Sequence, residues 1–429
     1  MDGVRAISQS IFDDAQKFNK VGPNHRFEGI LVSYENAKGS TVKRNTLVGP
    51  ELLPWVESSD IVADAKLQLV CVTSNSNNSL NVSHDMFSSM MRSLRVDTSV
   101  LLMICHTKDG FHFFPGDSDS MLPTWFSGTP RYAVLWTFDA KLCITKGIVI
   151  ERLGGVFKGL TGVVDKFADY IHAPQVMCLS IPIYQMHLYE AKTEDALNSL
   201  RVIEKSIGFG PQKGGNQWQG GQLNTFLGHG DTSTIDETLA LSRKVHEVIS
   251  RIRNNDRLRQ ISTRMLEDIL NASRTTVDGC HEPEGKQHKH YHALQKLSEA
   301  VSVLQQQINA NANYLGYMKY RAENLSQVIV ALLTHEDAAA SIDLAAASKK
   351  DTSSMKTIAI MTMLFLPATF FAALFSVPLL QWDHQVVVHN KFWVYWAFTL
   401  PSTAAVFAIW LATTSAGNTF RAWKDTWKS

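Results

Sequence analysis

Residues 357–380, TIAIMTMLFLPATFFAALFSVPLL, decide how this chain is built, because none of these 24 residues carries a charge. A helix of that length spans about 36 Å at 1.5 Å per residue. The hydrocarbon core of a bilayer is about 30 Å thick, so the stretch is long enough to cross it. We therefore predict a first transmembrane helix at residues 357–380.

A second uncharged run, FWVYWAFTLPSTAAVFAIWLATT at residues 392–414, follows after a link of only 11 residues, 381–391. So short a link predicts an antiparallel pair of transmembrane helices. The alternative is a pair of buried helices in a soluble core, although two such runs side by side are rare there. Aromatic residues lie near the ends of the runs, as in an interfacial belt: Trp382, Phe392, Trp393, Tyr395, Trp396, Trp423 and Trp427.

Basic residues are distributed unevenly around the two runs. The loop between the runs contains only Lys391, whereas the outer flanks carry Lys349, Lys350, Lys356, Arg421, Lys424 and Lys428. Cytoplasmic flanks of membrane helices hold the excess of lysine and arginine. We therefore predict a multi-pass membrane protein with both termini in the cytoplasm, including the tail at 415–429, and the loop outside. The sequence does not identify which membrane holds it.

A cytosolic helical stalk is predicted at residues 233–356. Two series of positions spaced seven apart, beginning at Leu294 and Leu297, are apolar at eleven of twelve sites, with Asn311 as the exception. This period predicts a long helix from about residue 291, whose packing seam faces either another protomer or another helix of the same chain. No glycine or proline occurs from residue 335 to 366, so we expect the helix to continue into the membrane. A preceding amphipathic helix is expected at about 234–274.

Residues 1–208 are predicted to form a cytosolic α/β domain. Strand-like runs rich in β-branched and aromatic residues are FEGILVSYE, LQLVCVTS, VLLMICHT and YAVLWTF. Helices are expected near residue 85, with Ser83 or Asp85 as the cap, and from about 186 to Gly208. The Gly- and Gln-rich segment 209–232 is predicted to be a loop. It is not a phosphate-binding motif, because it does not follow a strand.

Composition excludes several classes of function. The chain has 41 basic and 40 acidic residues, which argues against a nucleic acid partner held by bulk charge. Hydrophobic residues make up 45% of the chain, which excludes a disordered tail protein. The five cysteines form no CxxC motif and are expected to be free, buried thiols in a reducing compartment. No catalytic constellation stands out, so we predict neither an enzyme nor a bound cofactor.

The order of these parts resembles the CorA-type divalent metal transporters. The stretches ASKKDTSSMKTIAIMTMLFLPATFFAALFSVPLLQW and FWVYWAFTLPSTAAVFAIW look similar to the divergent CorA-like proteins of fungi. The resemblance implies a CorA-like funnel, in which an α+β cytosolic domain and a long stalk helix continue into a two-helix transmembrane hairpin. It also implies a homopentamer in the lipid bilayer, a pore lined by the first membrane helix, and Mg²⁺ as the usual transported or regulatory ion.

The signature of that family, Gly-Met-Asn after the first membrane helix, is absent. Phe375, Ser376, Val377 and Pro378 stand at the equivalent place. This difference supports an alternative function as a membrane-anchored scaffold or regulatory protein that keeps the fold without conducting.

Three hydroxyl residues recur every seven positions along the first run: Thr362, Thr369 and Ser376. In a ring of five helices they would line a pore and contact a hydrated Mg²⁺ through its waters. The alternative is that each hydroxyl bonds to a carbonyl of its own helix. The predicted pore entrance consists of Ser376, Val377, Pro378 and Asp383.

Other residues could bind the ion outside the pore. Asp383 is the only carboxylate of the loop, and five copies around a mouth would concentrate cations. His384 and His389 are softer ligands and support a second alternative, a zinc-selective relative. By resemblance, stalk carboxylates could sense the ion, and the candidates are Asp343 and Asp351, with Glu336 and Asp337 nearby; the alternative is a solvated helix face.

One further cluster of metal-ligating residue types precedes the stalk helix, and its members are Cys280, His281, His288, His290 and His292. Such residues bind Zn²⁺ or Cu²⁺ in other proteins. Their spacing matches no structural zinc module, and the surrounding Pro283 and Gly285 favour a solvated turn.

Overall fold

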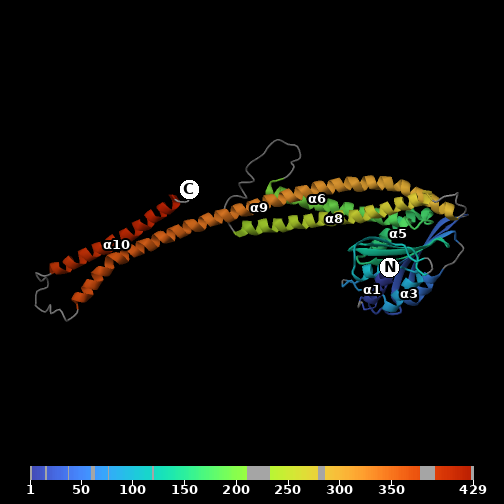
Figure 1. Cartoon of the computed structure of the whole chain (residues 1–429), viewed down its shortest axis with the longest axis horizontal. Helices are drawn as coiled ribbons and strands as arrows, with labels where there is room; N and C mark the ends of the chain where they lie inside the picture. The colour runs from blue at the N-terminus through green and yellow to red at the C-terminus, as the bar shows by residue number, and fades with distance from the viewer. Residues whose placement is uncertain are drawn as a thin grey trace. The chain divides into compact units, whose positions relative to one another are not determined.

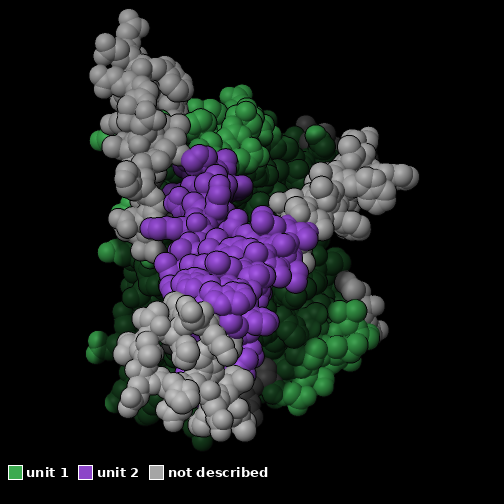
Figure 2. Space-filling model, turned by 90° about the vertical axis from the view of Figure 1, so that its left-hand side faces the viewer, with its two compact units in different colours: residues 1–226, 236–330 green, residues 227–235, 331–429 purple. Residues whose placement is uncertain are grey.

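The computed structural model describes residues 2–14, 17–36, 38–58, 63–75, 77–117, 120–209, 232–278, 286–376 and 392–426. The chain divides into two compact units, coloured separately in Figure 2. The first unit consists of residues 1–226 and 236–330, and the second of residues 227–235 and 331–429.

The first unit is built on a mixed seven-stranded sheet with the order β2-β1-β3-β7-β6-β5-β4. All neighbouring strands are antiparallel except β3 and β7, which run parallel. The strands are β1 (Arg26–Glu35), β2 (Gly39–Val48), β3 (Ala65–Thr73), β4 (Gly110–Phe114), β5 (Thr124–Gly128), β6 (Tyr132–Asp139) and β7 (Ile144–Glu151). Three of the four predicted strands are therefore confirmed, as β1, β3 and β6.

Helices cover both faces of this sheet (Figure 1). One face packs on α1 (Asp2–Asp13), α2 (Gly49–Glu57), α3 (His84–Ser93) and α4 (Val100–Cys105). The other packs on α5 (Val156–Lys166), α6 (Val176–Ile207), α8 (Thr232–Asp278) and the first part of α9 (Lys286–Phe375). Successive strand residues point to opposite faces, so Leu69 and Val70 of β3 lie in different cores.

The prediction of a strand at VLLMICHT was wrong, because Val100–Cys105 is the helix α4. Its buried residues, Val100, Leu101, Ile104 and Cys105, recur with helical rather than alternating spacing. A run this short has no period that distinguishes the two structures. The nearby prediction of α3 is confirmed, with Ser83 rather than Asp85 as its cap: the Ser83 hydroxyl accepts a hydrogen bond from the Met86 N–H at 3.3 Å.

The stalk helices α6, α8 and α9 pack on one another within the first unit. The Asn255 amide donates to the Thr193 hydroxyl at 3.3 Å, and the Ser262 hydroxyl donates to the Gln185 amide oxygen. Heptad positions such as Ile308 and Leu325 are buried. The seam of α9 therefore faces helices of its own chain, which settles one alternative that the sequence left open.

The long helix is continuous from Lys286 to Phe375, as the lack of helix breakers after residue 335 predicts. It ends five residues before the predicted limit of the first membrane run at 380, and Ser376 lies in a turn. Helix α8 begins and ends within four residues of its predicted limits, 234 and 274. Helix α6 ends before Gly208, whose φ of 73° is the left-handed conformation that favours glycine at a helix end.

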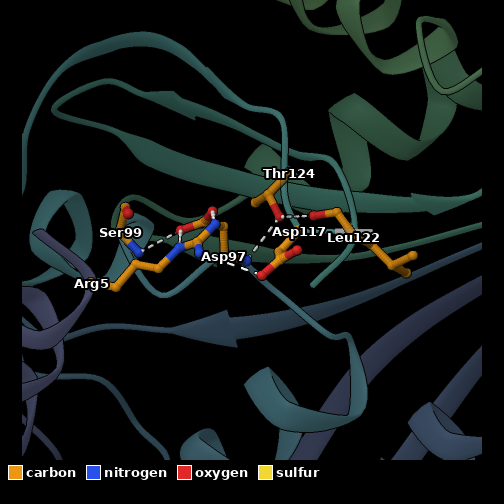
Figure 3. Close-up of polar contacts among 6 residues, drawn as sticks. All are labelled: Arg5, Asp97, Ser99, Asp117, Leu122 and Thr124. Atoms are coloured by element: carbon orange, nitrogen blue, oxygen red, sulfur yellow. Dashed lines mark hydrogen bonds and ion pairs between the residues drawn. The ribbon is translucent and has the colours of Figure 1, made fainter. Parts of the chain in front are cut away.

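A buried carboxylate ties the N-terminal helix to the sheet domain (Figure 3). Asp97 is fully buried and accepts a hydrogen bond from Arg5 Nη2 at 2.8 Å and from the Ser99 N–H at 2.9 Å. Its own N–H donates to the Thr124 hydroxyl at 3.0 Å. Burial alone would raise the pKa of Asp97, but the hydrogen bonds from Arg5 and Ser99 outweigh it and hold the pKa below its usual value.

Replacing Asp97 by Asn should lower stability by about 2 kcal/mol at pH 7, because hydrogen bonds to a charged group are stronger than neutral ones. The folded-state pKa lies below the unfolded value of about 3.9. The stabilisation is therefore complete above that pH and is lost as the pH falls through the folded-state pKa. Thermal unfolding of both proteins from pH 7 to pH 3 tests this. A difference that does not shrink below pH 4 would contradict the assignment.

Candidate functional site

The second unit contains two helices that are long and apolar enough to cross a membrane: the C-terminal part of α9, and α10 (Phe392–Thr426). Only 6% of the most apolar window of each helix is buried within the chain. Large side chains such as Ile358, Phe365 and Trp393 are more than half exposed. Apolar surface of this extent requires a lipid or protein neighbour.

The two helices contact each other along one face. The Tyr395 hydroxyl donates a hydrogen bond to the Ala368 carbonyl at 3.2 Å, and the rings of Phe371 and Phe398 lie 6.1 Å apart. The Lys356 ammonium lies 5.7 Å from the centre of the Trp410 ring. Residues 368 and 356 thus pair with 395 and 410, which shows that the helices run antiparallel.

Each predicted pore hydroxyl donates to its own helix. Thr362, Thr369 and Ser376 hydrogen-bond to the carbonyls of Ile358, Phe365 and Ala372, four residues earlier, with distances of 3.0 Å for Thr369 and 2.7 Å for Ser376. This is the alternative that the sequence left open. It does not remove the oxygens from use, because a hydroxyl that donates its proton keeps lone pairs as acceptors.

The three hydroxyls also lie away from the face of α9 that packs on α10. All three residues are exposed, whereas Ala359, Met363, Pro367 and Phe371 form a row of partly or fully buried residues, with Ala368 partly buried beside it. At 3.6 residues per turn, the hydroxyl row is rotated roughly 140° from that buried row. Helix α10 therefore leaves a continuous line of oxygen acceptors uncovered.

The packing face of α10 was not predicted. Its least exposed residues include Tyr395, Thr399, Val406 and Trp410, and Thr399 is only 4% exposed. Their spacing of four, seven and four residues is helical. That spacing is the signal in the sequence that could have identified this face.

Most of the predicted pore entrance lies outside the residues that the structure describes. This holds for Val377, Pro378 and Asp383, and also for His384 and His389. Ser376 is described and exposed.

The candidate sensing carboxylates lie on a solvent-exposed part of α9. Asp337, Asp343 and Asp351 are exposed, and Glu336 is half-buried. The described residues hold no group of three or more His, Cys, Asp or Glu side chains placed to bind a metal ion. The structure of one chain therefore does not bring these residues together.

The histidine cluster is dispersed. Cys280 and His281 lie outside the described residues, and His288 and His292 are exposed. His290 instead anchors the start of α9 to the sheet domain: its Nδ1 lies 2.9 Å from the His172 carbonyl oxygen, and its ring stacks on Phe138 at 5.8 Å. The four described cysteines, Cys71, Cys105, Cys143 and Cys178, are buried, as predicted, and none of them forms a disulfide with another described residue.

Comparison with known proteins gives limited matches. No protein-family model matches the chain, and no curated protein matches it. Among solved structures, the chain is similar to one titled "structure of the full-length CmaX protein", with a TM-score of 0.42 and 9% sequence identity over 92% of this chain and 99% of that chain. The chain itself has an α+β N-terminal domain, a long helix and two helices long and apolar enough to span a membrane.

Proposed function

We propose that this chain forms a CorA-like membrane channel that moves divalent cations, Mg²⁺ first, down their electrochemical gradient. The pore would be lined by the C-terminal part of α9, and the chains would assemble as a homo-oligomer, a pentamer by resemblance. The observation that supports this most directly is the exposed row of Thr362, Thr369 and Ser376, on the side of α9 away from α10.

The chemistry of this row suits a hydrated cation. Mg²⁺ dehydrates reluctantly and keeps several of its waters. Those waters turn their oxygens to the ion and their protons outward, so the surrounding wall must accept hydrogen bonds. Each hydroxyl has given its own proton to a carbonyl and can only accept from such a water. Five copies would supply three layers of acceptors without removing the hydration shell.

Two alternatives remain. A membrane-anchored scaffold without conduction is favoured by the absence of Gly-Met-Asn at residues 375–378. A zinc-selective relative is favoured by His384 and His389, because imidazole binds Zn²⁺ better than it binds Mg²⁺.

Ion uptake into liposomes separates these functions. The purified full chain would be reconstituted with an internal fluorescent indicator and an inside-negative potential, and Mg²⁺, Co²⁺, Ni²⁺ and Zn²⁺ would be added in turn. We expect Mg²⁺ entry well above that of protein-free liposomes. Entry of none of the four ions would favour the scaffold, and entry of Zn²⁺ alone would favour the zinc-selective relative.

Exchange of Asp343 and Asp351 for Asn should leave the channel open at high Mg²⁺. The proposal is that these exposed carboxylates bind the ion between protomers when it is abundant, so neutral side chains would remove the inhibition. The measurement is Mg²⁺ flux against Mg²⁺ concentration on the cytosolic side. Unchanged inhibition would show that the two residues belong to a solvated helix face.

A further inference from the structure

Positive charge is concentrated where the sheet of the first unit meets α6 and α8. We call this group the cation cluster. It consists of Arg131 in the β5–β6 turn, Arg152 after β7, Lys192 on α6, and Arg251 and Arg257 on α8.

Hydrogen bonds hold the supporting segments of the cation cluster together. The Arg152 N–H donates to the Arg131 carbonyl at 3.0 Å, so these two residues are neighbours. The Gln185 amide donates to the Tyr132 hydroxyl at 2.6 Å, which joins α6 to the turn. The hydrogen bond between Asn255 and Thr193 joins the α8 segment that carries Arg251 and Arg257 to the α6 segment that carries Lys192.

The surrounding carboxylates do not balance this charge. Asp109 pairs with Arg257, and Glu247 pairs with Arg251 at 2.6 Å. Arg131, Arg152 and Lys192 make no ion pair with any described residue. The Nε of Arg131 is buried and has no hydrogen-bond partner in this part of the chain. A buried donor without an acceptor costs about 1–3 kcal/mol, so an unfilled acceptor position is indicated.

The electrostatics point in the same direction. Burial, followed by the positive charges of Arg131 and Arg251, lowers the pKa of Lys192. Burial also lowers the pKa of Arg152, and the opposite effect of the negative charge of Asp109 is smaller. Like charges held in a partly buried site repel each other more strongly than they do in water. An anion placed among them would relieve this repulsion.

We propose that the cation cluster is a binding site for a multivalent oxyanion, the chemistry of a phosphate-bearing small molecule. Guanidinium groups match the oxygens of a phosphate in pairs, and an ammonium adds a point charge. Five cations against Asp109, Glu247 and the nearby Glu151 leave a net positive charge, which favours a multivalent anion over chloride. The bound anion would link the β5–β6 turn to both stalk helices and so stiffen the joint between the sheet and the stalk. This site is separate from the proposed pore and does not depend on transport.

Inorganic pyrophosphate is the probe, with sulfate as a second anion. The full chain in detergent micelles would be titrated by calorimetry in about 0.15 M NaCl, where long-range attraction is screened. We expect saturable binding at one site per chain. Arg131→Gln and Lys192→Gln should each raise the dissociation constant at least tenfold. Lys158→Gln, at an exposed lysine of α5, should leave it unchanged.

Two further measurements separate a binding role from a structural one. Without anion, Lys192→Gln should unfold at the same temperature as the native chain or higher, since a repelling charge has been removed. Lys192→Arg should retain pyrophosphate binding. No saturable binding of either anion, or equal binding by the native chain and both Gln variants, would overturn the proposal. If Arg131→Gln does not fold, Lys192→Gln decides the question.

Discussion

Replacement of Thr369 by Val should lower Mg²⁺ flux at least about tenfold. Val has nearly the same shape as Thr but offers no oxygen, so the variant keeps the packing of α9 and removes one ring of acceptors. A hydrogen bond of this kind contributes about 1 kcal/mol. A net loss of about 1.4 kcal/mol, shared among five copies, already slows passage tenfold. The measurement is the initial rate of Mg²⁺ entry into liposomes at equal protein content.

The matched control is Thr403→Val on α10. The Thr403 hydroxyl donates to the Thr399 carbonyl at 2.7 Å, so it has the same bonding to its own helix as Thr369. It lies on the partly buried side of α10, outside the hydroxyl row. We expect near-native flux from this control. Near-native flux from both variants would show that Thr369 does not line the pore, and equally reduced flux from both would show that the effect comes from membrane-helix stability.

Elements whose sequence pattern extends over many residues could be predicted from the sequence, whereas elements of only five or six residues could not. The heptad series beginning at Leu294 extends over six repeats, and the uncharged run at 357–380 is longer than a bilayer is thick, so chance matches are rare. The heptad series and residues 357–375 of the uncharged run lie in the continuous helix α9. By contrast, α4 has only 6 residues, and strands such as β4 and β5 have 5 each, too few to show a period.

The sequence also does not identify which helix or side chain contacts a given face of α9. Heptad spacing shows that α9 has a seam, but not whether α8 or a second chain covers it, because both would present apolar residues. The seven-residue spacing of the hydroxyls places them on one side of α9. The sequence does not show whether these hydroxyls donate to a carbonyl of their own helix or to a neighbouring group, because that depends on the side-chain conformations in the folded chain. The cation cluster was not predicted, because Arg131, Lys192 and Arg251 are distant in sequence and converge only through the fold.

Replacement of Arg321 by Leu should destabilise the stalk by about 3 kcal/mol. Arg321 on α9 makes a bidentate ion pair with Glu204 on α6, with Nε–Oε1 at 3.0 Å and Nη2–Oε2 at 2.6 Å. The two side chains are only 13% and 9% exposed. Loss of the arginine would leave a nearly buried carboxylate without a partner, which costs more than the ion pair itself contributes. Hydrogen exchange of the α6 and α9 amides near the pair, measured on the full chain, should accelerate about a hundredfold.

The double variant Glu204→Leu with Arg321→Leu tests the reason for that loss. If the lost stability comes from the buried, unpaired carboxylate of Glu204, removal of both charges should restore the hydrogen-exchange protection to within about 1 kcal/mol of the native chain. Lys319→Leu is the matched control, since Lys319 and Glu323 form an exposed pair at 4.0 Å on the same helix, and such pairs contribute under about 1 kcal/mol. A double variant as unstable as Arg321→Leu would show that the bidentate geometry itself holds α6 to α9. The ion pair would then add to the buried apolar seam of α9, which includes Ile308 and Leu325, in holding these helices together.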